Sequence, residues 1–132
     1  MSTPSLAAAP AMLETVRVDE VQPVVVGPGC HRRDLPSASG VRVWVVDMAP
    51  GSTWPVVDEH PGGEYVQVIA GELIEGEQRF GPGTYLFFKP GSSHRPRTEH
   101  GVRLFGFNPA GSVQPELPLN SPALDLPRPG RA

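Results

Sequence analysis

Apolar and polar residues alternate along short stretches of this chain, and glycines and prolines separate the stretches. Residues 16–26, 41–48, 53–60, 64–71, 72–80, 84–90 and 102–108 are the clearest of these and are rich in Val, Phe, Tyr and Ile. Alternation with a period of two is typical of strands that bury one face. Turn sequences such as HPGG, EGE, GPG and PGSS lie between them. We therefore predict an all-β fold of antiparallel strands, arranged as a sandwich or a small barrel.

Composition limits the fold and the domain organisation. Seventeen prolines and fifteen glycines among 132 residues exclude an all-helical fold, because a proline inside a helix removes a donor and clashes with the preceding turn. The length suits one domain. We expect an extended N-terminal arm in residues 1–15, a β-domain in residues 16–110 and a Pro-rich C-terminal tail in residues 111–132. We expect this tail to be either disordered, above all in its last ten residues, or, because of its spaced leucines, an extended strap across the domain or a partner subunit.

Charge and cysteine content narrow the partners and the compartment. The net charge of -3 and the scattered basic residues argue against nucleic acid or an anionic membrane as a partner. The single Cys30 cannot form an internal disulfide, and the N-terminus lacks the features of a signal peptide. We therefore expect a cytoplasmic protein. The valine-rich stretch VQPVVV favours strand exchange with a second copy, and hence a homodimer.

Candidate metal ligands gather around two glycine-containing turns. Asp58 and His60 share one face if their strand is regular, and Glu64 follows the PGG corner. A tight hairpin between the two strands would bring Glu64 opposite the first pair. His94 follows another glycine turn. Two imidazoles with one or two carboxylates are a donor set that divalent transition metals prefer.

These positions resemble the two motifs of the cupin superfamily, the RmlC-like jelly-roll barrels. The first motif is matched by Asp58, His60, Glu64 and Gly71, and the second by Gly83, Gly91 and His94. The resemblance is firm over residues 41–108. From residue 32 the chain is similar, more narrowly, to the cupin domain of ChrR-type anti-sigma factors and to small stand-alone relatives that include acetylacetone-cleaving dioxygenases. The resemblance implies a single-domain β-barrel that binds one metal ion inside, typically through three histidines and a glutamate.

The resemblance assigns His60, Glu64 and His94 as metal ligands, while Asp58 stands where the family usually has its first histidine. Two histidines and one carboxylate also form the facial triad of non-haem Fe(II) oxygenases. Three interpretations of Asp58 stay open: a fourth ligand to the metal, a group that orients His60, or the mark of a lost metal site. If burial raises its pKa, Asp58 can also act as a catalytic base.

The leading functional hypothesis is a metal-dependent oxidoreductase with a small-molecule substrate. Its first candidate reaction is that of an Fe(II) dioxygenase on a diketone or a phenolic compound, although Mn, Ni, Zn and Cu accept the same ligands. The alternatives are a non-redox isomerase, cyclase or decarboxylase, a non-catalytic ligand- or metal-sensing cupin, and a metal-free barrel. ChrR-type cupin domains act beside a helical, zinc-bearing module, and we expect no such module in the residues before 41.

The remaining polar and aromatic candidates are interpreted as structural. Trp54 is expected to fill the core, with contact to a pocket as the lesser alternative. His31 and His100 lie outside the motifs and are expected at the surface. Arg95 points outward if the neighbouring His94 points inward.

Overall fold

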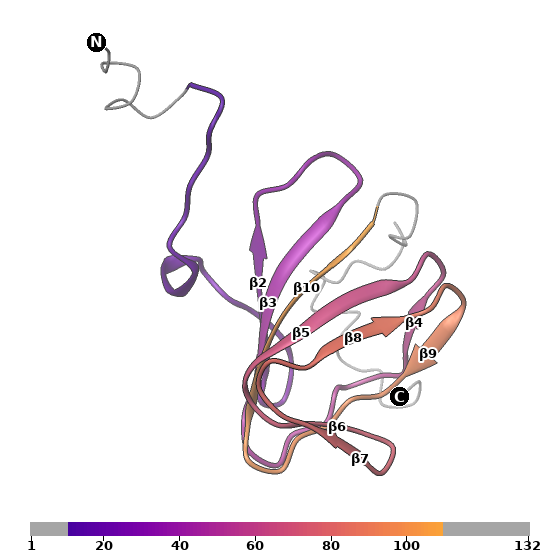
Figure 1. Ribbon diagram of the computed structural model, residues 1–132. Coiled ribbons are helices and arrows are strands. Elements are labelled where there is room, and N and C mark those ends of the chain that lie inside the picture. The colour runs from indigo at the N-terminus through magenta and orange to yellow at the C-terminus, as the bar shows by residue number, and fades with distance from the viewer. Residues whose placement is uncertain (1–10, 110–132) are drawn as a thin grey trace.

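The structure is a computed structural model, and it describes residues 11–109 (Figure 1). Within this range the chain forms a short 3-10 helix, η1 (Val18–Glu20), and ten strands: β1 (Val24–Gly27), β2 (Cys30–Leu35), β3 (Arg42–Met48), β4 (Asp58–His60), β5 (Glu64–Gly71), β6 (Leu73–Glu75), β7 (Gln78–Phe80), β8 (Tyr85–Phe88), β9 (Ser92–His94) and β10 (Val102–Asn108). No helix in this range has the length and apolar character needed to cross a membrane. Most of the predicted arm and all of the predicted tail lie outside the described residues.

Six strands form one antiparallel sheet in the order β1-β2-β3-β10-β5-β8. Two short pairs, β4-β9 and β6-β7, complete the fold, and isolated bridges from Arg97 to Thr53 and Ile74 link them. In the view of Figure 1 the short pairs lie beyond β8, on one side of the large sheet. The predicted all-β jelly-roll class is confirmed.

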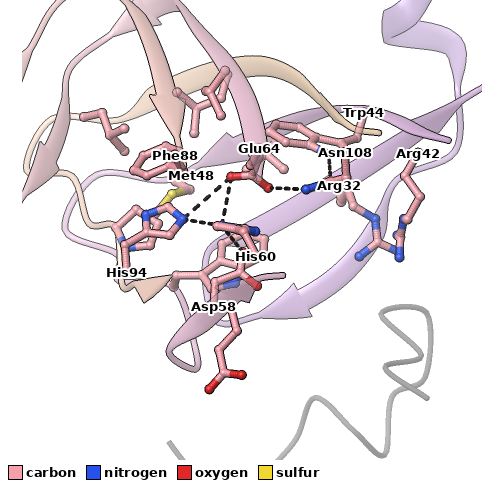
Figure 2. A pocket seen from close by; sticks show the side chains of 17 residues that line it. Arg32, Arg42, Trp44, Met48, Asp58, His60, Glu64, Phe88, His94 and Asn108 are labelled. Carbon is pink, nitrogen blue, oxygen red and sulfur yellow. Dashed lines mark hydrogen bonds and ion pairs between the residues drawn. The ribbon is translucent and has the colours of Figure 1, made fainter. Parts of the chain in front are cut away.

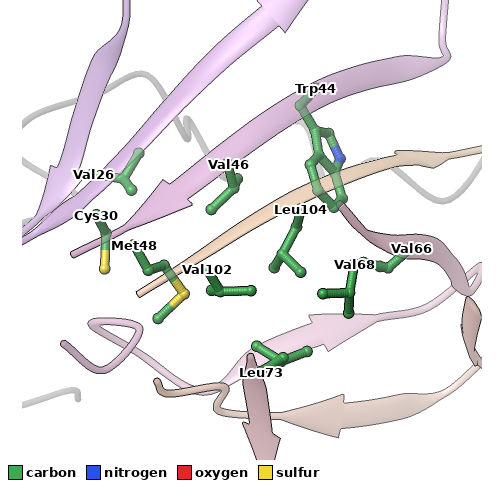
Figure 3. Packing of buried hydrophobic residues seen from close by; sticks show 10 residues of the cluster. All are labelled: Val26, Cys30, Trp44, Val46, Met48, Val66, Val68, Leu73, Val102 and Leu104. Carbon is green, nitrogen blue, oxygen red and sulfur yellow. The ribbon is translucent and has the colours of Figure 1, made fainter. Parts of the chain in front are cut away.

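The hydrophobic core lies between the large sheet and the short pairs. Alternate residues of β3, Trp44, Val46 and Met48, point inward, and Leu73 of β6 packs against them from the other layer (Figure 3). The other buried members are Val26, Cys30, Val66, Val68, Val102 and Leu104. Burial of this apolar surface is the main force that closes the two layers over one another.

Gly106 allows one core side chain to lie close against the large sheet. A Cβ atom at this position would collide with the Trp44 ring and with the Tyr65 carbonyl oxygen. The absence of a side chain therefore lets the Trp44 indole cross β10 at short range. This placement matters for the site, because the indole nitrogen of Trp44 bonds to Asn108 at the end of β10.

The strand boundaries differ from the prediction at several points. The stretch 53–60 is interrupted at Pro55, which has no backbone donor, so only Asp58–His60 pairs as β4. The stretch 72–80 is not one strand but the hairpin of β6 and β7. The pattern also does not predict β2, because one of its buried positions is Arg32, and a buried arginine breaks the expected alternation.

The predicted hairpin between residues 53–60 and 64–71 does not form. Instead β4 pairs with β9, which places Asp58 opposite His94, while β5 enters the large sheet between β10 and β8. The chain turns at Gly63, whose φ of 92° is open to glycine, and the Gly63 amide donates to the His60 carbonyl oxygen at 3.1 Å. Glu64 therefore faces the histidines from the other layer rather than from a neighbouring strand.

Candidate metal centre

Four side chains converge inside the molecule (Figure 2). Asp58 and His60 extend from β4, Glu64 from the first position of β5, and His94 from the last position of β9. One ligand atom of each residue lies within 4.8 Å of those of the other three. The structure thus brings together the four residues that the motif spacing predicts as metal ligands.

The two histidines face each other through their Nε2 atoms. These atoms are 2.8 Å apart, and Glu64 Oε1 lies 3.2 Å from His60 Nε2 and 3.6 Å from His94 Nε2. Asp58 Oδ2 lies 3.6 Å from the same nitrogen of His60. All four donor atoms therefore surround one small volume. Imidazole nitrogens and carboxylate oxygens gathered in this way are the donor atoms that a shared cation would need.

Glu75 on β6 fixes the orientation of the His94 ring. Its Oε2 atom lies 2.7 Å from His94 Nδ1, and the Phe88 ring stacks on the imidazole with centroids 4.0 Å apart. When Nδ1 donates to Glu75, the neutral imidazole directs the lone pair of Nε2 into the cluster. Metal-bound histidines commonly donate their other nitrogen to a carboxylate in this way. The sequence motifs do not point to Glu75.

A relay from the large sheet positions the Glu64 carboxylate. Trp44 Nε1 donates to Asn108 Oδ1 at 2.9 Å, and Asn108 Nδ2 donates to Glu64 Oε2 at 3.1 Å. One carboxylate oxygen is thereby held by the sheet, while Oε1 is left to face the two histidines. Asn108, like Glu75, is missed by sequence reasoning, because its contact joins residues 44 positions apart.

The cluster has strongly perturbed protonation equilibria. Burial, followed by the negative charge of Glu64, raises the pKa of Asp58 to about 6. Burial alone would also raise the pKa of Glu64, but hydrogen bonds with His60 and His94 outweigh it and lower that pKa to about 2. Burial opposes charge on His94, yet hydrogen bonds with Glu64 and Glu75 raise its pKa to about 9. The metal-free cluster therefore holds a Glu64 carboxylate against a His94 imidazolium.

The cluster lines a cavity that opens to solvent. The cavity volume, taken as the space open to the centres of water-sized molecules, is about 80 Å³. Apolar walls come from residues such as Val46, Trp54 and Leu104. Trp54 therefore packs against the core, as expected, and also contacts the cavity. An apolar cavity with a few convergent polar groups is the usual form of a small-molecule site.

The donor set fits a divalent transition ion. Two imidazole nitrogens and carboxylate oxygens suit Fe, Mn, Ni, Zn or Cu, and separate partners hold His94 and Glu64 with their donor atoms turned toward the same point. A cluster of this composition can hold a metal ion.

The histidines outside the motifs do not join this cluster. The His100 side chain is 80% exposed and lies 3.8 Å from Glu99 Oε1, while His31 is half-buried on β2. Arg95 is exposed and donates through Nε to the Trp54 carbonyl oxygen at 2.7 Å, so it points away from the neighbouring His94.

Comparison with known protein families identifies the family of this domain. The family described as the ChrR cupin-like domain matches residues 12–113. The chain belongs to this family. No match to a curated protein sequence was found.

Solved structures share the fold at low sequence identity. A chain of the complex of SigE with the anti-sigma ChrR from Rhodobacter sphaeroides matches with a TM-score of 0.64 and 21% identity, over 70% of this chain and 52% of that chain. The polyketide cyclase RemF from Streptomyces resistomycificus matches with 0.64 and 18%, over 83% and 96%. An acetylacetone dioxygenase from Acinetobacter johnsonii matches with 0.63 and 12%, over 76% and 75%. The cupin likeness thus spans proteins of different activity, and this chain covers about half of the first of them.

Proposed function

We propose that this cupin is a metal-dependent enzyme with a small organic substrate, in which His60, Glu64 and His94 hold one divalent transition ion. The observation that carries the proposal is the meeting of two Nε2 atoms, 2.8 Å apart, with Glu64 Oε1 at the wall of a cavity. Buried ionisable groups are costly unless they are paired or coordinate a metal. A shared cation satisfies all three side chains at once.

Fe(II) with dioxygenase chemistry is the first candidate within this proposal. Two histidines and one carboxylate are the ligands of the facial triad, and an acetylacetone dioxygenase is among the proteins of the same fold. The bound ion would supply Lewis acidity and a redox centre. The apolar walls of the cavity exclude water from an enolisable diketone or a phenol. The polyketide cyclase of the same fold supports a non-redox reaction as the alternative.

Asp58 is proposed as a fourth oxygen ligand or as the catalytic base. Its side chain retains 28% exposure, against 3% for His60 and 8% for Glu64. It therefore lies nearest to entering substrate, where its carboxylate can accept and return a proton at Oδ2. The variant Asp58→Asn separates the two roles. If Asp58 acts as the base, this variant should lose turnover but keep its metal ion.

Metal analysis of protein purified without chelator tests the proposal. We expect about one ion per chain in the wild type and in the control His100→Ala, and far less than one in His60→Ala and His94→Ala. With Fe(II) restored, the wild type should consume oxygen in the presence of acetylacetone or a catechol. A reconstituted wild type that stays far below one ion per chain would contradict the proposal.

A sensory domain is the second candidate, and the ChrR cupin-like family match favours it. Such a domain would use the same cluster and cavity to bind a metal ion or a ligand without turnover. Binding of metal without oxygen uptake or product, across a panel of diketones and phenols, would favour the sensor over the enzyme.

We also propose a homodimer formed through β1. This strand lies at one edge of the large sheet, and Val25 on it is 61% exposed. The unpaired backbone groups of an edge strand can pair with a second copy. Light scattering at micromolar concentration should give the mass of two chains, and a monomer mass would contradict the proposal.

The lone Cys30 supports the further proposal of a reducing, cytoplasmic location.

A further inference from the structure

Two arginines line the cavity on the side away from His94 (Figure 2). Arg42 begins β3 two residues before the inward-facing Trp44, so both side chains share the inner face of the sheet. Arg32 extends from the neighbouring β2. Cationic side chains inside a partly apolar cavity need negative partners, and the two arginines differ in how they find them.

Arg32 is closely paired with Asp34. Its Nε and Nη2 atoms donate to the two carboxylate oxygens of Asp34 at 2.8 Å and 3.2 Å. The fork of the guanidinium thus meets the carboxylate in two parallel bonds, the strongest form of this contact.

Arg42 has a much weaker carboxylate contact. Within the described residues its nearest one is Asp34 Oδ1, 3.8 Å from Nη2, which is longer than a hydrogen bond. Its side chain is only 20% exposed. Burial, followed by the positive charge of Arg32, lowers the pKa of Arg42, while the charges of Asp34, Asp58 and Glu64 act in the opposite direction. The guanidinium therefore shares the cavity with the carboxylates of the cluster.

The sheet register makes the two ends of the cavity neighbours. Arg42 lies directly opposite Asn108 on β10, and the Asn108 amide donates to Glu64. One compact molecule can therefore contact the guanidinium and the cluster together.

Among the described charged residues of the cavity, Arg42 has its nearest carboxylate contact, with Asp34, only at 3.8 Å. A divalent ion in the cluster would balance Asp58 and Glu64, and Asp34 already balances Arg32. The Arg42 guanidinium can then pair with a negative group of a molecule that enters the cavity. Guanidinium groups bind carboxylates through two parallel bonds.

We propose that Arg42 binds the carboxylate of the substrate, and that this protein acts on a small keto or hydroxy acid whose second oxygen faces His60, Glu64 and His94. The metal end of this inference rests on the proposed function. The carboxylate end rests on Arg42 and can be measured separately.

A pair of probes of similar shape tests the carboxylate end. Acetoacetate carries a carboxylate where acetylacetone carries an acetyl group. Their binding can be followed by tryptophan fluorescence, because Trp44 and Trp54 line the cavity. Wild type should bind acetoacetate at least about tenfold more tightly than acetylacetone. Arg42→Gln should weaken acetoacetate binding by about 10- to 100-fold, the usual effect of losing hydrogen bonds to a charged group, and should leave acetylacetone binding nearly unchanged.

Two further variants control for charge and folding. Arg79→Gln removes an arginine whose partners are Glu72 and Glu99 on the exposed surface, and should bind both probes as the wild type does. Arg42→Lys keeps the charge but loses the fork, and should give an intermediate affinity for acetoacetate. If Arg42→Gln melts at a lower temperature, Arg42→Lys still tests the role of the guanidinium fork.

Equal affinity for the two probes, or equal acetoacetate affinity in wild type and in folded Arg42 variants, would overturn the inference. Metal content measured on the same samples keeps this failure apart from failure of the proposed function. A metal-loaded protein without the Arg42-dependent preference keeps the function and loses the inference. A protein that shows the preference but never binds metal keeps the carboxylate end of the inference and loses the function.

Discussion

Replacing Glu75 with alanine tests how the protein prepares His94 for a metal ion. The hydrogen bond between Glu75 Oε2 and His94 Nδ1 is 2.7 Å long, and the two side chains are only 15% and 11% exposed. A hydrogen bond to a charged group in such surroundings contributes about 1.5–3 kcal/mol. Since about 1.4 kcal/mol corresponds to a tenfold change in affinity, Glu75→Ala should weaken metal binding by about 10- to 100-fold. Glu75→Gln keeps a neutral acceptor and should lose about tenfold.

The pH of this assay decides how much of the loss is visible. Glu75 also stabilises the protonated form of His94, whose pKa is raised to about 9, and a proton on Nε2 competes with the metal. Removing Glu75 weakens both proton and metal binding, so the loss should be larger at pH 9 than at pH 7. Competition with a chromogenic zinc chelator measures the affinity. Glu77→Gln, on the exposed turn between β6 and β7, is the matched control. Unchanged affinity in Glu75→Ala at pH 9 would refute the proposed role.

Three further results are expected. Asn108→Leu should lower the free energy of unfolding in urea by about 1–3 kcal/mol, because Trp44 Nε1 and Glu64 Oε2 lose their partner; unaltered stability would show that the relay is not needed. Burial raises the pKa of Cys30 to about 11, so iodoacetamide at pH 8 should modify the unfolded protein much faster than the native one, and equal rates would count against this burial. In chelated protein, the pKa of His94 rises from 6.5 to about 9 on folding. This shift stabilises the fold fully below pH 6.5, and the contribution is lost as the pH rises through 9. Urea unfolding should show the decline for wild type and not for His94→Asn.

The sequence predicts the parts of the fold that follow a local pattern. On β3, Trp44, Val46 and Met48 face the apolar core at every second position, and the prediction of a strand there is confirmed. On β8, alternation shows only that Leu86 and Phe88 face opposite to Tyr85 and Phe87. The structure places Leu86 and Phe88 against the core and leaves Tyr85 62% exposed. The choice depends on what covers each face, which the local pattern does not contain.

The partners of the site depend on pairings between distant strands. The two motifs mark His60 and His94, but the carboxylate that holds His94 comes from Glu75 on β6, a strand that the pattern merges with β7. Asn108 reaches Glu64 only because β10 lies between β3 and β5 in the sheet. In the sequence, Arg42 cannot be told apart from any other charged residue at the start of a strand. Its place inside the cavity follows from the same sheet order. Motifs therefore locate the candidate ligands, and strand order supplies the groups that orient them.

An anomalous-scattering map of crystals grown with one added divalent metal shows whether the cluster holds an ion. We expect a single strong peak bonded to His60 Nε2, His94 Nε2 and Glu64 Oε1 at about 2.0–2.2 Å. The same map shows whether Asp58 Oδ2 is a fourth ligand. A map with no peak between the two imidazoles, or with the ion bound elsewhere in the described domain, would contradict the claim that these side chains share a cation.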